Sequence, residues 1–146
     1  MNSGCVFCKI VENQIPAFKI FESEDILAFL DINPLSQGHS LIIPKNHFED
    51  VFDIPQDILK EIIQAAQKIS KIMQKELGAE GVNLFNASRK EAEQSVFHFH
   101  LHIIPRYKED GLKINEWWQL KAKKADLQEL EKIAEGLRKS VGNKVY

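Results

Sequence analysis

The chain has 146 residues, of which 44% are hydrophobic and 27% charged, and its formal net charge is −2. This composition is that of a globular protein, and the length fits a single domain over residues 1–146 that buries roughly two thirds of its unfolded surface without a disulfide or a metal. Because basic and acidic residues are interleaved and no stretch approaches the ~20 apolar residues of a membrane span or forms a secretory leader, we expect a cytoplasmic protein with neither polymeric nucleic acid nor membrane as partner.

The first third of the chain predicts three strands. Residues 18–21 and 26–30 are rich in apolar and aromatic side chains, and the polar run between them is typical of a hairpin turn. A loop containing proline and glycine then leads to a third strand at residues 39–43, which Pro44 ends.

The middle of the chain changes to a helical period, since apolar residues recur every three or four positions between Asp53 and Gly78. Asp53 is the expected N-cap, Pro55 lies in the first turn, and Gly78 ends the helix. Two more strands are expected at residues 81–85 and 96–104.

A terminal helix is predicted from an apolar face formed by Leu127, Leu130, Ile133, Ala134 and Leu137. The sum is an α+β fold with about five antiparallel strands, one long central helix and a C-terminal helix. The motifs described below all lie in residues 5–107, and residues 108–146 form an extension.

Three histidines, His98, His100 and His102, occupy alternate positions within five residues. In a strand they would lie on one face, about 7 Å apart from one to the next, with Phe97, Phe99, Leu101 and Ile103 on the core face. A solvated face would normally carry Lys or Glu instead. A three-histidine metal site is an alternative, but side chains along one straight strand converge poorly on a single ion.

Imidazole is also a nucleophile toward phosphorus, and a second imidazole beside it can assist the leaving group. The middle position, His100, is the natural nucleophile. The pattern therefore favours an enzyme that acts on a phosphorus centre.

The segment His98-Phe99-His100-Leu101-His102-Ile103-Ile104 resembles the signature of the histidine triad (HIT) superfamily, and residues 5–10, 31–34, 38–47 and 94–96 resemble other HIT motifs. The resemblance is closest to the small bacterial HIT hydrolases near the Hint branch. It implies a HIT-like fold and hydrolysis or nucleotidyl transfer at the α-phosphate of purine nucleoside phosphoramidates or adenylates, through a nucleotidyl intermediate on His100.

The same resemblance implies roles for further residues. His102 would contact the phosphoryl oxygens, His39 would lie at the site, and Ser95 would hydrogen-bond to the leaving group. The nucleotide would be bound by Asp31 at the ribose, Asn86 near the phosphate and Gln94 beside Ser95, with an apolar base slot from Phe7, Ile10, Phe29 and Leu30. Considered by themselves, Asp31 and Asn86 are also ordinary turn residues and Ser95 an ordinary strand-edge residue.

Three alternatives stay open at this point. A diadenosine polyphosphate hydrolase would use the same nucleophile, and a zinc-containing nucleotide-binding protein would keep the fold with little turnover. A zinc-dependent hydrolase would need a metal with an open coordination position. Family members usually pair through the long helix and its neighbouring strand, so a homodimer is expected.

Cys5 and Cys8 form a Cys-x-x-Cys pair, which both redox motifs and metal half-sites use. The HIT resemblance implies a structural zinc held by Cys5, Cys8, His47 and His98, a closed tetrahedral set. Free buried thiols and a redox pair are alternatives. A redox pair is disfavoured because no helix, whose N-terminus would lower a thiol pKa, is expected after Cys8.

Glu93 departs from the family pattern, which commonly has glycine at this position before Gln94. If glycine lets the backbone approach the phosphate, a carboxylate there should disturb that contact or repel an anionic substrate.

Overall fold

The structure is a computed structural model that describes residues 4–141, apart from the side chain of Trp117. The chain divides into two compact units, Met1–Asp110 and Gly111–Tyr146. The division falls close to the predicted start of the C-terminal extension, and a single domain over the whole chain stays a prediction.

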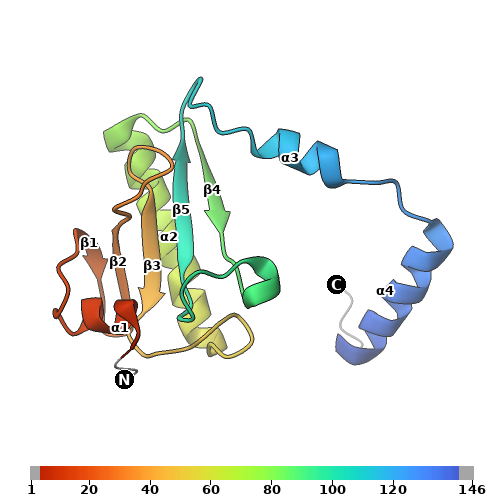
Figure 1. The fold of residues 1–146 in the computed structure, drawn as a ribbon, viewed down its shortest axis with the longest axis horizontal. Coiled ribbons are helices and arrows are strands. Elements are labelled where there is room, and N and C mark those ends of the chain that lie inside the picture. The colour runs from red at the N-terminus through yellow and green to blue at the C-terminus, as the bar shows by residue number, and fades with distance from the viewer. Residues whose placement is uncertain (1–3, 142–146) are drawn as a thin grey trace. The chain divides into compact units, whose positions relative to one another are not determined.

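In chain order, the first unit contains helix α1 (Val6–Val11), strands β1 (Lys19–Glu22), β2 (Ile26–Leu30) and β3 (Ser40–Pro44), helix α2 (Gln56–Leu77), strand β4 (Gly81–Phe85), the short 3-10 helix η1 (Lys90–Ala92) and strand β5 (Leu101–Arg106) (Figure 1).

The five strands form one antiparallel sheet in the order β1-β2-β3-β5-β4. The predicted α+β class, five-stranded antiparallel sheet and long helix are confirmed. The hairpin of β1 and β2 is confirmed as well. Because β5 pairs with both β3 and β4, His102 lies opposite Leu41 on one side and Phe85 on the other.

Side chains of each strand alternate between the two faces of the sheet, and both faces are covered. On one face, Ile26, Ala28 and Ile42 pack against the apolar stripe of α2. On the other face, Leu27, Phe29, Leu41 and Ile43 pack against α1. Each fully buried aliphatic side chain contributes about 1.5–3 kcal/mol, so the short helix α1 is held by packing rather than by its length.

The strand that carries the histidines begins later than predicted. A strand was expected over residues 96–104, but β5 spans Leu101–Arg106. His98 and His100 therefore lie in an irregular segment before the strand, and only His102 lies in it. The prediction of three imidazoles spaced along one straight strand is wrong.

Backbone hydrogen bonds explain this late start. The N–H of Phe99 donates to the carbonyl of Phe48 at 2.6 Å, and the N–H of His98 donates to the carbonyl of Val96 at 2.9 Å, so this stretch turns instead of joining the sheet. Phe99 is 1% exposed, as expected for the core face, whereas Phe97 is 52% exposed, contrary to the prediction.

The long helix ends as predicted but begins differently. Gly78 is its C-cap, with a left-handed φ of 70° and an N–H that donates to the carbonyl of Met73. The N-cap is Pro55, so the prediction of Asp53 is wrong. Asp53 instead accepts a hydrogen bond from the N–H of Glu49 at 2.9 Å.

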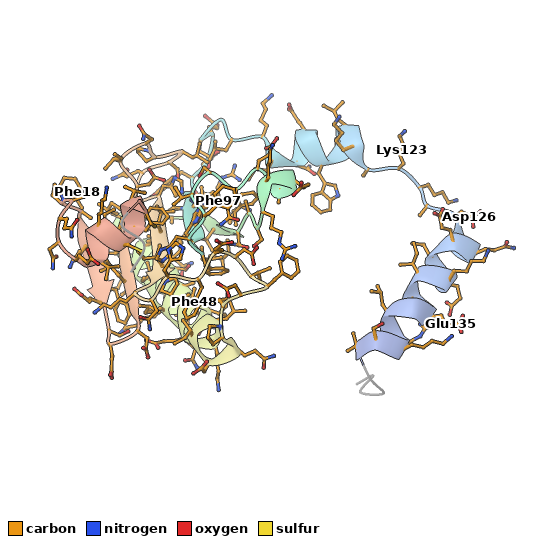
Figure 2. All side chains as sticks on the ribbon, turned by 60° about the horizontal axis from the view of Figure 1, so that its bottom comes forward. Phe18, Phe48, Phe97, Lys123, Asp126 and Glu135 are labelled. Atoms are coloured by element: carbon orange, nitrogen blue, oxygen red, sulfur yellow. The ribbon has the colours of Figure 1, made fainter. Side chains whose placement is uncertain are left out.

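The second unit contains helices α3 (Ile114–Lys121) and α4 (Leu127–Val141). The terminal helix was predicted, and α3 was not. Asp126, labelled in Figure 2, precedes α4, and its carboxylate accepts hydrogen bonds from the N–H groups of Gln128 and Glu129. This is the contact of a helix N-cap. Across the described residues, every helix is too short or too polar to span a membrane.

Candidate active site

A cavity of about 310 Å³ opens on the sheet face that carries α1. The four residues of the expected base slot all line it, namely Phe7, Ile10, Phe29 and Leu30. The polar part of its wall contains Asp31, Ser95, His100 and His102. The cavity therefore brings together an apolar surface of aromatic and aliphatic side chains and the imidazole pair singled out by the sequence.

The ring of Phe7 links these two parts of the wall. Its centroid lies 5.9 Å from that of Phe29 and 5.3 Å from that of His100, both in edge-to-face arrangement. Helix α1 thus packs directly against the proposed nucleophile.

His100 is 2% exposed, and its ring is oriented by the backbone. Its Nδ1 lies 2.8 Å from the carbonyl oxygen of His98. A carbonyl oxygen only accepts hydrogen bonds, so Nδ1 carries the proton and Nε2 keeps its lone pair, the form of imidazole that attacks an electrophile. Burial lowers the pKa of His100, which keeps the ring neutral at pH 7.

His39 and His102 form a directed pair. The N–H of Leu35 donates to Nδ1 of His39 at 3.1 Å, and Nε2 of His39 lies 2.9 Å from Nδ1 of His102. Because Nδ1 of His39 accepts, its Nε2 carries the proton and donates to His102. His102 therefore carries its own proton on Nε2, and the chain of hydrogen bonds ends in a free donor.

The environment keeps this pair neutral. Burial, followed by the charges that His100 and His39 would carry, lowers the pKa of His102 to about 4. Burial also lowers the pKa of His39, although Asp31, whose Oδ2 lies 3.9 Å from His39 Nε2, opposes this effect. Neutral rings preserve the donor and acceptor assignment at pH 7.

Asp31 and Ser95 lie on the cavity wall, where ribose and leaving-group contacts were predicted. Asp31 follows β2, and its Oδ1 accepts a hydrogen bond from the N–H of Asn33 at 2.8 Å. This turn fixes the carboxylate where the strand ends.

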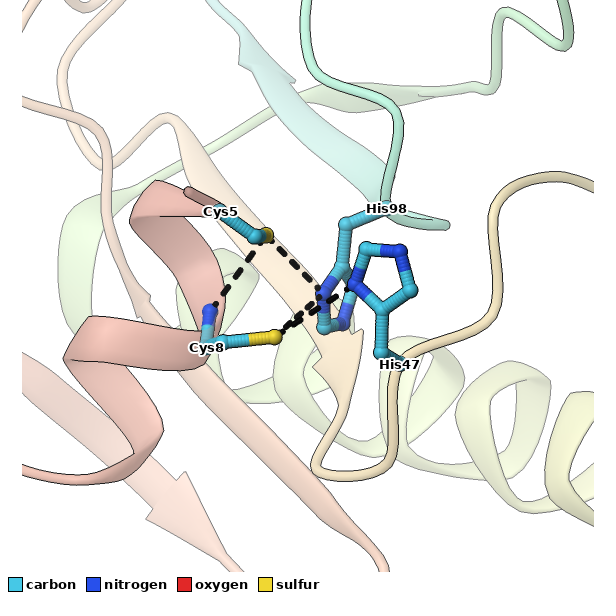
Figure 3. A group of neighbouring side chains, drawn as sticks. All are labelled: Cys5, Cys8, His47 and His98. Carbon is cyan, nitrogen blue, oxygen red and sulfur yellow. Dashed lines mark hydrogen bonds between the residues drawn. The ribbon is translucent and has the colours of Figure 1, made fainter. Parts of the chain in front are cut away.

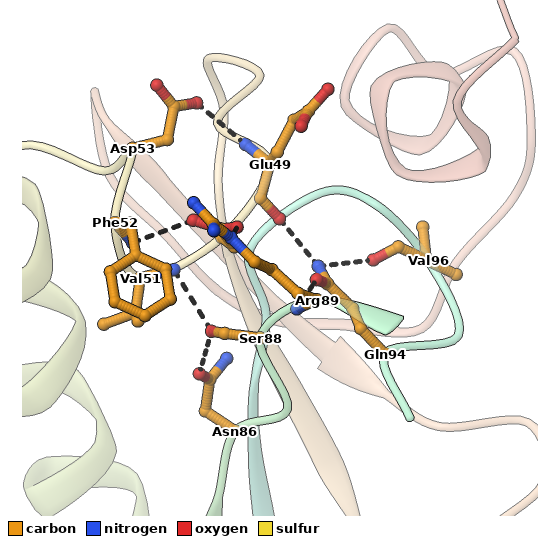
Figure 4. Close-up of polar contacts among 10 residues, drawn as sticks. Glu49, Val51, Phe52, Asp53, Asn86, Ser88, Arg89, Gln94 and Val96 are labelled. Atoms are coloured by element: carbon orange, nitrogen blue, oxygen red, sulfur yellow. Dashed lines mark hydrogen bonds and ion pairs between the residues drawn. The ribbon is translucent and has the colours of Figure 1, made fainter. Parts of the chain in front are cut away.

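Asn86 and Gln94 belong to the loop between β4 and β5 (Figure 4) and are absent from the described lining of the cavity. Asn86 donates from Nδ2 to the carbonyl oxygen of His100 at 2.8 Å and accepts from the hydroxyl of Ser88. Gln94 donates to the carbonyls of Glu49 and Val96. In this structure the side-chain amides of both residues bind backbone carbonyls. The carbonyl that Asn86 binds belongs to His100, the expected nucleophile.

A second set of contacts joins this loop to residues 49–53, and the sequence analysis missed it (Figure 4). Arg89 donates from Nε to Oδ2 of Asp50 at 3.0 Å, and its guanidinium lies 4.5 Å from the ring centroid of Phe52. The hydroxyl of Ser88 accepts from the N–H of Val51 at 3.1 Å. Opposite charges 39 positions apart gave no local signal, because only the fold brings them together.

The same loop contains two non-glycine residues with positive φ, Arg89 at 74° and Glu93 at 61°. These bracket the short helix η1. Such conformations are uncommon for residues with a side chain and persist where surrounding contacts fix them. The glycine expected by the family pattern at position 93 matches this left-handed backbone.

Four metal-ligating side chains meet beside the cavity, as Figure 3 shows. The ligand atoms of Cys5, Cys8, His47 and His98 all lie within 4.8 Å of one another. Sγ of Cys5 lies 3.4 Å from Nδ1 of His98, and Sγ of Cys8 lies 3.4 Å from Nδ1 of His47 and 3.7 Å from Nδ1 of His98. A tetrahedral zinc with usual bond lengths separates sulfur and nitrogen ligands by about 3.6 Å, so the donor set fits zinc.

The ring of His98 is prepared for this role. Its Nε2 donates to the carbonyl of Pro44 at 2.9 Å, which leaves the Nδ1 lone pair facing the two sulfurs. Burial lowers the pKa of His98 to about 4, and neutral imidazole is the form that binds a metal.

The prediction that no helix accompanies the cysteine pair is wrong. Helix α1 begins at Val6 with Cys5 as its N-cap, and the N–H of Cys8 lies 3.5 Å from Sγ of Cys5. Because this helix is present, a redox pair is not disfavoured on that ground. The two imidazole partners, rather than the absence of a helix, distinguish this pair from a simple dithiol.

A match to the HIT domain family covers residues 12–109. The chain belongs to the HIT family. Among curated proteins it is 33% identical over 144 residues to an adenosine 5'-monophosphoramidase from Candida albicans, covering 96% of this chain and 93% of that protein. This kinship supports hydrolase activity.

Solved structures are similar as well. SMU.412c from Streptococcus mutans is 35% identical with a TM-score of 0.88, covering 97% of this chain and 88% of that one. A zinc-bound histidine triad family protein from Mycobacterium smegmatis is 40% identical with a TM-score of 0.72, covering 75% of this chain and 80% of that one. The HIT fold is thereby shown, and zinc is a compatible metal for the cysteine and histidine cluster.

Proposed function

We propose that this HIT protein hydrolyses nucleoside phosphoramidates or adenylates at the α-phosphorus through a covalent intermediate on His100. The observation that carries the proposal is the tautomer of His100. Its Nδ1 proton is held by the carbonyl of His98, so a free Nε2 lone pair belongs to a buried, neutral ring on the cavity wall. The phosphoramidase relative supports the substrate class.

In the first step, Nε2 of His100 forms a bond to phosphorus while the bond from phosphorus to the leaving group breaks. The ring becomes positively charged, and its Nδ1–H stays directed at the carbonyl oxygen of His98, whose dipole stabilises that charge. The amide of Asn86 holds the carbonyl of His100 and so fixes the position of the nucleophile.

His102 and Ser95 stabilise the departing charge. The Nε2–H of His102 donates to a phosphoryl oxygen, and the hydroxyl of Ser95 transfers its proton to the leaving group as that group departs. In the second step water attacks the nucleotidyl-histidine, the bond from phosphorus to Nε2 of His100 breaks, and a proton of the water returns to Ser95. Over both steps, water supplies the hydroxyl that remains on phosphorus and the proton that remains on the leaving group.

The apolar wall supports a purine as the base. Phe7 and Phe29 provide aromatic surface for a planar ring, and the carboxylate of Asp31 lies on the same wall to accept hydrogen bonds from ribose hydroxyls. We infer that the metal cluster holds a structural zinc, because two thiolates and two imidazoles leave no coordination position for a reacting water.

We also propose a homodimer. Strand β4 is an edge of the sheet, yet its side chains Val82, Leu84 and Phe85 are 40 to 55% exposed, and α2 exposes Ile63 and Ile72. A second copy would cover this apolar edge. Light scattering should give twice the chain mass for the wild type and a single chain mass for Leu84→Glu.

The decisive experiment incubates the protein with adenosine phosphoramidate and quenches it within the first turnovers. Mass spectrometry should find an added adenylyl group on the peptide containing His100, and both the adduct and turnover should be lost in His100→Ala. A folded wild type that binds the nucleotide without turnover would overturn the hydrolase proposal and leave a binding protein.

A further inference from the structure

The described lining of the cavity contains a carboxylate but neither lysine nor arginine. Asp31 is the only carboxylate in that lining, and the imidazoles of His100 and His102 are its other ionisable groups. A phosphoryl group bound here has no permanent cation beside it in that lining. Each further phosphate on a substrate would therefore enter without a cation to offset its charge.

Glu93 is a second carboxylate that lies close in the chain to Ser95, on the leaving-group side of the cavity. It is exposed, and it precedes by two residues Ser95, which lines the cavity. Consecutive Cα atoms are about 3.8 Å apart, so the backbone of Glu93 lies within roughly 8 Å of that of Ser95. A glutamate side chain spans much of that distance.

The backbone of Glu93 is held by hydrogen bonds within the loop. Its own N–H donates to the carbonyl of Lys90 at 2.9 Å, and its φ is 61°. On the following residue, Oε1 of Gln94 accepts from the N–H of Arg89 at 2.6 Å while Nε2 donates to the carbonyl of Glu49 at 2.6 Å. These contacts hold the loop on both sides of the carboxylate.

Nearby cations do not neutralise it. The guanidinium of Arg89 is paired with Asp50 and lies over Phe52. Lys90 and Glu91 are both exposed in η1 and have opposite charges. Counted together with Asp50, the charged residues of this loop, Arg89, Lys90, Glu91 and Glu93, sum to −1.

Resting on the hydrolase function proposed above, we propose that Glu93 selects the leaving group by charge. The enzyme favours nucleoside phosphoramidates whose departing amine carries a second, protonated amine, and it discriminates against anionic leaving groups, including the nucleotide half of dinucleoside polyphosphates. Two exposed charges roughly 7 Å apart, screened as in bulk water, change a rate by about threefold, so substrates that differ by two charges should differ by roughly tenfold through this one carboxylate.

The test uses three adenosine phosphoramidates of similar size whose leaving amines are 1,2-diaminoethane, propylamine and β-alanine, which are cationic, neutral and anionic at the distal group. The value of kcat/KM is measured for each at low and high salt. Wild type should prefer the cationic over the anionic substrate, and Glu93→Gln should lower that ratio about tenfold. Glu91→Gln, which removes a carboxylate from the same loop, is the matched control and should leave the ratio near the wild-type value. High salt should reduce the wild-type preference.

The outcomes separate the two proposals. Failure of the wild type to hydrolyse even the neutral substrate would refute the hydrolase function. Turnover of the neutral substrate, with a charge ratio that Glu93→Gln does not change in a folded variant, would refute selection by Glu93 alone. Diadenosine tetraphosphate cleaved as fast as the neutral phosphoramidate would also refute it.

Discussion

Nε2 of His39 and Nδ1 of His102 lie 2.9 Å apart, and the backbone N–H of Leu35 determines which ring donates. A main-chain group outside the catalytic segment thus sets the proton position on a residue inside it.

Replacing His39 with leucine removes the donor to His102, so its ring can take either tautomer. We expect kcat to fall by about 10–100-fold with a smaller effect on KM, since the contact orients a catalytic group. Glutamine places an amide N–H near the position of Nε2, and His39→Gln should recover much of the loss. Both variants are measured by steady-state kinetics on folded protein. Equal losses would argue against a hydrogen bond from His39 that orients His102.

The pH dependence of kcat/KM follows from the lowered pKa values. An ordinary histidine would be half protonated near pH 6.5, but His102 has its pKa lowered to about 4 and that of His100 is lowered as well. His102 therefore stays neutral as the pH falls through 6.5 towards about 4, and His100 titrates below its ordinary range, so the acid limb of the activity profile should lie below pH 6.5. An acid limb centred near pH 6.5 for the wild type would contradict this assignment.

The ion pair of Asp50 and Arg89 should couple the loop before β5 to the segment before α2. Because the side chain of Arg89 is 62% exposed, we expect a coupling of about 0.5–1 kcal/mol in unfolding free energy from the cycle of Asp50→Asn and Arg89→Gln. Because the loop carries Ser95, KM should rise in both single variants. The exposed pair Glu135 and Lys139 is the control and should leave KM unchanged.

Zinc removal should destabilise the protein without revealing a chemical role for the metal. Chelation, or Cys8→Ser, is expected to lower Tm by several degrees, with activity lost in step with the folded fraction. Elemental analysis should find one zinc per chain in wild type and in His39→Gln, whose histidine lies outside the cluster. Cobalt substitution should preserve turnover, and a cobalt enzyme that is folded but inactive would point to a catalytic metal.

Much of the fold follows from local pattern. The strands at Ile26–Leu30 and Gly81–Phe85 coincide with the predicted ranges, and Gly78 ends the long helix as its left-handed φ requires. These signals depend only on neighbours in the chain, which is why sequence periodicity and turn chemistry find them.

The errors have a common physical origin. Helix α1 has six residues, too few for a periodic signal, and is formed by packing on the sheet. The segment around His98 has strand-like alternation but bonds to Phe48 and Val96 instead. The nucleotide contacts of Asn86 and Gln94 stay predictions from the family resemblance, and the backbone groups that their amides contact could not be found from sequence because only the folded loop supplies them.

Helix α1 and its N-cap contribute Cys8 and Cys5 to the metal cluster, and the same helix contributes Phe7 and Ile10 to the cavity wall, from a span of barely two turns. With zinc and nucleotide bound as proposed, the two ligands would share one rigid element. Their binding free energies would then be coupled, and the coupling must be reciprocal. A bound nucleotide would slow the escape of zinc to a chelator by the same energetic link through which zinc strengthens nucleotide binding.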